Sequence, residues 1–196
     1  MLLNGISTSP LRNAHVAYNE KEILFVGGSD ASPSPDFLSP GQRQPDLDLP
    51  DFTLLPGLIE AHTHLSLEGA ELDAHQRAVH LKQTPEALLK AARRRLEKLV
   101  RIGVISVRDA GDKDGVGLTL SKLYQSEGRP LMPYVDSPGA AIHHKGRYGS
   151  LMAEPIEKFD SLMHCVEARV KAGADRIKLI ATGIINFKQG RVTTEP

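Results

Sequence analysis

The chain has 196 residues, 40% of them hydrophobic, which is enough for a packed core in one large domain. Its 24 basic and 24 acidic residues give a formal net charge of zero, so bulk charge gives no argument for nucleic acid or an anionic membrane as a partner. Cys165 is the only cysteine, which excludes an internal disulfide and fits a reducing compartment. No apolar run approaches the ~20 residues that cross a bilayer and no secretory signal is evident, so we expect a cytoplasmic protein.

The first part of the chain, residues 1–54, is predicted to be a small β-rich segment. Two short apolar runs, His15–Tyr18 and Ile23–Val26, flank the polar turn Asn19–Glu22, a pattern typical of a hairpin. The following stretch, residues 28–50, is dense in proline, serine, aspartate and glycine, which favours a loop with little regular structure.

From Leu55 onward the pattern changes to alternating strands and helices. The stretch LLPGLIEAHTHL (54–65) predicts the first strand, and the helix after it is the least clear. Thr84 followed by Pro85 and Glu86 is typical of a helix start, and Gly103 is placed to end that helix. The run VISVRD (104–109) predicts the second strand.

The pattern then continues through two further strands. A helix is predicted over Leu118–Ser126, and the third strand lies in PLMPYVDS (130–137). A second helical stripe should end at Gly173, and DRIKLIATG (175–183) predicts the fourth strand. This stripe has its apolar residues at Ile156, Phe159, Met163, Val166 and Val170. Such alternation favours parallel strands with helices packed outside. Residues 55–196 are too few for a closed eight-unit barrel, which needs roughly 250 residues. An open α/β sheet and about half of a barrel both remain possible.

Two histidines stand one residue apart at the end of the first predicted strand. Side chains alternate along a strand with period two, so His62 and His64 project to the same side and can reach one ion. Imidazole suits zinc and similar divalent metals. The alternative is two ordinary polar residues where a strand becomes a loop.

A lysine stands in the middle of the fourth predicted strand. Lys178 lies between Ile177 and Leu179, and burying an ammonium group costs free energy unless it is paired or neutralised. Without other context the lysine reads as one whose head group reaches water near a strand end.

The run from Pro56 to His64, with Leu58, Ile59 and Glu60 before the histidines, resembles the signature that opens the barrel of the amidohydrolase superfamily. Glu60 departs from the aspartate usual there. The resemblance implies a fold that is α/β, the first half of a (β/α)8 TIM barrel, over residues 55–196. It further implies that residues 1–54 belong to a composite β-sandwich. Lys178 then matches the lysine that carries a carbamate bridging two metals in binuclear members.

GVISVRDAGD (103–112) resembles the second strand of the imidazolonepropionase-like and prolidase-like branch, with Ile105 and Ser106 in place of two threonines. We favour an ion pair between Arg108 and Asp109 over direct substrate contact. The loop after the third strand is where relatives place substrate-contacting residues, and barrel active sites lie at this end. Its candidates for a substrate carboxylate or carbonyl are His143, His144, Arg147 and Tyr148; a solvated polar loop is the alternative.

The resemblance therefore implies a metal-dependent hydrolase of a C–N bond in an amide, a cyclic amide or a dipeptide, acting through a metal-activated water. Expected metal residues are His62, His64 and Lys178, with one or two divalent ions, zinc above all. Further histidines and the catalytic aspartate would come from later strands, outside these 196 residues. His75, His80 and His164 read as non-catalytic.

Two other classes of protein fit the same residues. One is a non-catalytic, metal-binding half-barrel that needs a partner, its missing half or a second copy, because an open half-barrel exposes strand edges. The other is an open α/β binding protein in which the histidines are incidental.

Overall fold

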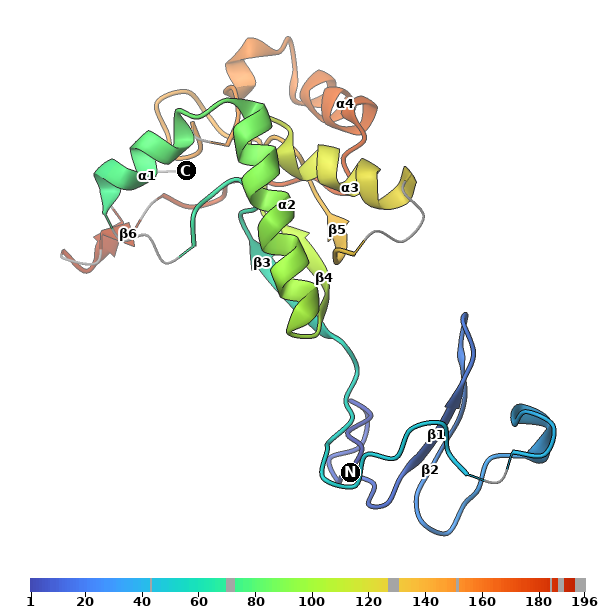
Figure 1. Cartoon of the computed structure of the whole chain (residues 1–196). Helices are drawn as coiled ribbons and strands as arrows, with labels where there is room; N and C mark the ends of the chain where they lie inside the picture. Colours follow the sequence, from blue (N-terminus) through green and yellow to red (C-terminus); the bar gives the residue numbers. More distant parts are fainter. Residues whose placement is uncertain are drawn as a thin grey trace. The chain divides into compact units, whose positions relative to one another are not determined.

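Figure 1 shows the chain as a computed structural model. The structure describes residues 1–42, 44–69, 73–126, 131–150, 152–183, 185–186 and 189–192. It divides into two compact units, Met1–Pro56 and Gly57–Pro196. Within the described part of the chain, no helix combines the length and apolar composition needed to cross a membrane.

The first unit is built around a two-stranded hairpin. Strands β1 (His15–Tyr18) and β2 (Ile23–Gly27) pair antiparallel, as the sequence predicts. The Asn19 side chain closes the turn, since its carbonyl oxygen accepts hydrogen bonds from the backbone N–H groups of Lys21 and Glu22 at 2.8 and 2.9 Å. The other described residues of the unit include one turn of 3-10 helix, η1 (Pro35–Phe37), and isolated bridges that join Leu2 to Leu11 and to Leu54.

The second unit contains a three-stranded parallel sheet in the order β3-β4-β5. The first three predicted strands are present, although the third is shorter than its sequence pattern. Parallel neighbours place the carboxyl ends of all three strands at one edge of the sheet. The strands are β3 (Leu58–Thr63), β4 (Val104–Asp109) and β5 (Tyr134–Asp136).

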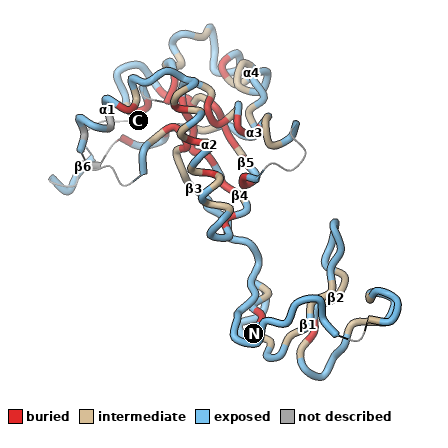
Figure 2. The backbone as a smooth tube through the Cα atoms, viewed as in Figure 1, coloured by how far each residue is buried: buried red, intermediate tan, exposed pale blue. Residues whose placement is uncertain are grey.

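Two helices cover one face of this sheet and form the main core with it. Helix α2 (Pro85–Arg101) buries Leu88, Ala92 and Leu96, and Thr84 caps its first turn as predicted. Helix α3 (Val116–Ser126) begins two residues earlier than the apolar pattern indicates. Their apolar side chains pack on Val104 and Val107 of β4 and Val135 of β5. Figure 2 shows buried backbone concentrated where α2 and α3 meet these strands.

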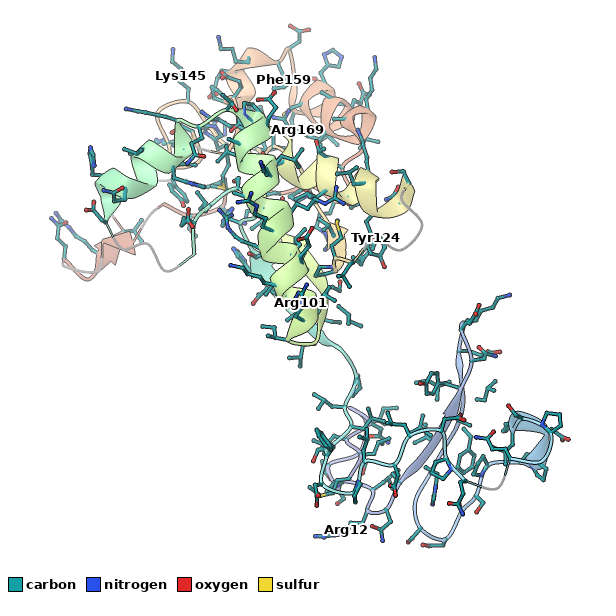
Figure 3. The ribbon with its side chains drawn as sticks, viewed as in Figure 1. Arg12, Arg101, Tyr124, Lys145, Phe159 and Arg169 are labelled. Atoms are coloured by element: carbon teal, nitrogen blue, oxygen red, sulfur yellow. The ribbon has the colours of Figure 1, made fainter. Side chains whose placement is uncertain are left out.

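The remaining helices are α1 (Ala74–Leu81) and α4 (Leu162–Ala172). Ser161 caps α4 and Gly173, with a φ of 92°, ends it, so the helix is shorter than the predicted stripe. Ile156 belongs to a separate 3-10 turn, η2 (Ile156–Lys158). Arg169 of α4 lies over the Phe159 ring at 5.2 Å, and Figure 3 labels both residues.

The fourth predicted strand is reduced to a single bridge. Leu179 pairs in parallel with Ile142, with hydrogen bonds of 2.8 Å from Ile142 N to Lys178 O and 3.0 Å from Ile180 N to Ile142 O. Ile180 packs with Ala141 and Met152 in a small second core. Beyond it, β6 (Ile185–Asn186) and β7 (Arg191–Val192) pair antiparallel.

Candidate metal and substrate site

His62 and His64 lie side by side where β3 ends. Their ring centroids are 5.6 Å apart and the ring planes meet at 69°, an edge-to-face arrangement. This is the geometry that strand alternation predicts for positions i and i+2. Two imidazoles from one strand end are therefore available on the same side of the sheet.

The ring of His64 is oriented by a backbone carbonyl. Its Nδ1 lies 3.1 Å from the carbonyl oxygen of Gly111, in the loop after β4. A carbonyl oxygen can only accept, so Nδ1 carries the proton in this contact and Nε2 keeps its lone pair. A carbonyl partner on one ring nitrogen is the usual way in which proteins orient a metal-binding histidine.

A cleft of about 90 Å³ opens beside His62. Its charged lining side chains are Arg108, Asp109, Arg176 and Lys178. Burial lowers the pKa of His62 most, and the positive charge of Lys178 lowers it further, followed by His64 and Arg108. A lowered pKa keeps the imidazole neutral, which is the form that binds a metal.

The side chains around His62 supply few of the ligands that a metal ion requires. Among the described residues, no three His, Cys, Asp or Glu side chains lie close enough together to hold one. His62 and His64 supply two nitrogen ligands, and the neighbouring lysine is a ligand only after its ammonium group has been converted into an anionic carbamate. Within the described residues, His62 and His64 are thus two candidate ligands, and further ligands would be needed to complete a metal centre.

The loop that follows His64 is held by two helices, a feature that sequence reasoning missed. Arg95 of α2 donates to the carbonyl oxygens of Leu65 and Leu67 at 2.8 and 2.7 Å. The buried His80 of α1 lies with Nε2 2.9 Å from the carbonyl oxygen of Ser66. His80 therefore contributes to holding this loop.

Asp109, at the end of β4, is 1% exposed and holds two neighbouring segments together. Its carboxylate accepts from Leu65 N at 3.2 Å and from Ser137 Oγ at 2.8 Å. Burial raises the pKa of Asp109, while the hydrogen bonds from Ser137 and Leu65 oppose the rise. A side chain on Gly117 would meet this carboxylate, since a Cβ there lies 2.2 Å from Oδ2.

The ion pair expected between Arg108 and Asp109 does not form. Consecutive residues of a strand point to opposite faces, and here Arg108 is exposed while Asp109 is buried with Ser137 and Leu65 as its partners.

The four residues predicted to contact substrate lie elsewhere than the cleft beside His62. His143 is buried, with Nδ1 2.9 Å from His144 O and Nε2 3.0 Å from Ala153 O. His144 Nδ1 pairs with Glu157 Oε1 at 2.9 Å. Tyr148 packs on the small core formed by Ala141, Met152 and Ile180, and Arg147 is exposed.

Comparison with solved structures relates this fold to hydrolases. The chain matches a Xaa-Pro dipeptidase solved with methionine in its active site, with a TM-score of 0.67 and 21% identity over 93% of this chain and 45% of the other. It matches an amidohydrolase with a TM-score of 0.64 and 17% identity over 93% and 45%. It matches the ochratoxinase of A. niger with a TM-score of 0.61 and 20% identity over 93% and 46%.

Matches of this kind concern the fold alone. No protein-family model and no curated protein matches the sequence. The chain spans less than half the length of the solved structures it resembles. It has a mixed α/β fold that corresponds to part of the amidohydrolase and prolidase structures.

Proposed function

We propose that the chain is an N-terminal portion of a metal-dependent hydrolase that cleaves a C–N bond in an amide, a cyclic amide or a dipeptide. In this proposal residues 55–196 form the first four β/α units of a (β/α)8 barrel. Support comes from the parallel sheet, from the fold matches to an amidohydrolase and a Xaa-Pro dipeptidase, and from the histidine pair. Fold alone does not fix chemistry, so the proposal depends on the side chains.

One observation carries the proposal: two imidazole rings meet at the carboxyl end of a parallel strand, with a lysine beside them. The ring centroids of His62 and His64 are 5.6 Å apart, and the charge of Lys178 lies near enough to His62 to lower the pKa of its imidazole. The Gly111 carbonyl leaves Nε2 of His64 as its ligand atom. These groups lie at the sheet edge where barrel enzymes carry their active sites.

The three residues would act as ligands and not as proton carriers. His62 and His64 would each offer a ring nitrogen, and Lys178, once carboxylated, would offer anionic oxygens. A bound divalent ion, for which zinc suits these ligands best, would polarise the scissile carbonyl and lower the pKa of water toward ~7. The proton-carrying aspartate of the reaction and the further histidines would lie outside these 196 residues.

The alternative function is a metal-binding half-barrel without catalytic activity that associates with a partner. One observation favours association: large apolar residues of the second unit are exposed to solvent, with Ile59 68% and Leu179 64% exposed. The exposed edges and apolar residues would be covered by a second copy of the chain or by the missing half of the barrel. Both functions share the metal site and differ in hydrolysis.

Metal binding tests the proposal most simply. The 196-residue chain is dialysed against Zn²⁺, and bound zinc per chain is measured for the wild type, His62→Ala and His164→Ala. His164 is the matched control, because it is exposed on α4 and pairs only weakly with Asp160 at 3.5 Å. We expect stoichiometric zinc in the wild type and the control, and at least about tenfold weaker binding in His62→Ala, since one of few ligands is lost.

Equal zinc affinity in His62→Ala and the wild type would contradict the proposal. Hydrolysis separates the two functions once zinc binds. Release of amino acid from Xaa-Pro dipeptides and N-acyl amino acids by the zinc-loaded protein favours the enzyme. Zinc binding with no hydrolysis, together with dimers in sedimentation, favours the half-barrel.

A further inference from the structure

Arg108 lies beside the histidine pair at the end of β4. β3 and β4 are neighbouring parallel strands, so His62 and Arg108 both lie near the carboxyl end of their strand. Both residues line the same cleft. Arg108 is therefore close to the place where a substrate would meet His62.

The cleft has more positive than negative charge available for a ligand. Among the described residues that line it, the cations besides Arg108 are Arg176 and Lys178, and the carboxylate is Asp109. Arg176 makes a two-pronged pair with the Asp136 carboxylate. Asp109 is buried, and its two oxygens already accept from Leu65 N and Ser137 Oγ. Neither Arg176 nor Asp109 is thus available to an incoming group.

Arg108 differs from Arg176 in having no such partner. Within the described residues, no hydrogen bond or ion pair engages its guanidinium, although the side chain is exposed at the cleft. An arginine fork is rigid and matches the two oxygens of a carboxylate. The guanidinium of Arg108, in a cleft next to His62, can therefore bind an anionic group of a ligand.

We propose that Arg108 binds a carboxylate of the ligand that occupies this cleft, so that the hydrolase takes a substrate with an anionic group close to its scissile bond. The statement that this ligand is a substrate rests on the proposed function. The anion site itself rests on the residues that line the cleft. It assigns recognition to the end of β4, apart from the His143–Tyr148 loop. Among the described residues that line the cleft, Arg108 is the arginine whose guanidinium has no hydrogen-bonded or ion-paired partner.

The test compares two ligands that differ in one charge. N-acetyl-L-proline carries a carboxylate and N-acetyl-L-prolinamide is neutral, with nearly the same shape. Dissociation constants of both are measured by NMR titration of the 196-residue chain, with and without Zn²⁺. We expect the acid to bind at least about tenfold more tightly than the amide, as for a hydrogen-bonded charge pair.

Three variants assign the preference to Arg108. Arg108→Gln keeps a polar side chain without charge and should bind both compounds equally. Arg108→Lys keeps the charge without the fork and should retain part of the preference. Arg101→Ala, at the exposed end of α2 and labelled in Figure 3, removes an arginine elsewhere and should leave the preference unchanged.

Failure of this inference and failure of the proposed function give different results. If zinc binds through His62 but the acid and the amide bind alike, the anion site is wrong and the hydrolase proposal stands. If Arg108→Gln keeps the wild-type preference, another cation binds the carboxylate and the inference is overturned. If the preference depends on Arg108 but no zinc binds, the anion site is right and the metal-dependent function is wrong.

Discussion

Ser137 Oγ donates a hydrogen bond of 2.8 Å to Asp109 Oδ2, which joins the end of β4 to the chain just after β5. Ser137 is joined in turn to Asp175, since its N–H donates to the Asp175 carboxylate at 2.9 Å and its carbonyl accepts from Asp175 N at 2.9 Å. Asp109 also binds Leu65 N, next to His64. These hydrogen bonds connect the chain after β3, the end of β4, the chain after β5 and Asp175.

Replacing Asp109 should destabilise the second unit. Asp109→Ala leaves the Ser137 hydroxyl and Leu65 N–H buried without an acceptor, at a cost of about 1–3 kcal/mol each. We expect a loss of about 2–4 kcal/mol in urea unfolding, and a smaller loss for Asp109→Asn, whose amide oxygen still accepts. Asp114→Ala, an exposed position in the same loop, serves as control and should change stability by no more than about 0.5 kcal/mol. A loss no greater than the control would show that the network contributes little.

Arg95 should support metal binding from outside the site. Arg95→Ala removes both donors to the carbonyls of Leu65 and Leu67, so the loop after His64 loses its clamp. We expect zinc affinity to fall by about tenfold, as for other groups that orient metal ligands, and partial recovery in Arg95→Lys. Hydrogen exchange of Leu67 N–H, which bonds to His64 O at 3.0 Å, should accelerate.

The matched control for the clamp is Arg94→Ala, because Arg94 is exposed on the same helix. It should leave both zinc affinity and exchange of Leu67 unchanged. If Arg95→Ala instead changes global unfolding but neither of these two readouts, the clamp serves stability alone.

Glu157 should titrate at unusually low pH. The hydrogen bond from His144 lowers the pKa of this carboxyl most, and its own backbone N–H and that of Lys145 add to the effect, to about 2 from 4.5. A folded-state pKa below the unfolded value means that the contact stabilises the loop above pH 4.5. This stabilisation is lost as the pH falls through about 2.

The measurement is an NMR titration of the Glu157 carboxyl carbon from pH 6 downward. We expect a midpoint near 2 in the wild type and in His164→Ala. In His144→Ala the midpoint should move up toward the ordinary glutamate value. A wild-type midpoint at 4.5 would mean that the pair with His144 does not persist in solution.

Lys178 should carry a carbamate when metal is bound. A neutral lysine amine would add carbon dioxide and release a proton to give a carbamate anion, and a divalent ion held by His62 and His64 would stabilise that anion. With ¹³C-bicarbonate and Zn²⁺, NMR should show a carbamate resonance that disappears in Lys178→Ala and persists in Lys145→Ala, a lysine on the exposed loop labelled in Figure 3. Full zinc occupancy in Lys178→Ala would exclude a ligand role for this residue.

Elements with strong local signals could be predicted from the sequence. The hairpin of β1 and β2 follows from two apolar runs and the Asn19 turn, and α2 from its Thr84 cap and apolar stripe. The predicted helix boundaries were wrong where a capping side chain determines the first residue of the helix. The Asp112 carboxylate accepts hydrogen bonds from Val116 N and Gly117 N, so α3 begins earlier than predicted. Ser161 caps α4, so Ile156 lies outside that helix, in η2.

The candidate site also has a part that local sequence signals predict and a part that they do not. The pairing of His62 with His64 depends only on strand alternation, so the sequence sufficed for their geometry. The partners of Asp109 and the targets of Arg95 lie 28 or more residues away in the chain and depend on how strands and helices pack. The fourth strand forms only one bridge, a pairing that the local pattern around Lys178 does not determine.

In the proposed function, His62, His64 and Lys178 bind the same metal ion. The most direct measurement is an anomalous difference map at the zinc edge, from crystals of the 196-residue chain grown with Zn²⁺ and bicarbonate. We predict a peak about 2.0–2.1 Å from a ring nitrogen of both His62 and His64, with carbamate oxygens of Lys178 at about 2.0–2.2 Å. A zinc peak next to other residues, with both histidine rings free of metal, would show that His62 and His64 are not metal ligands.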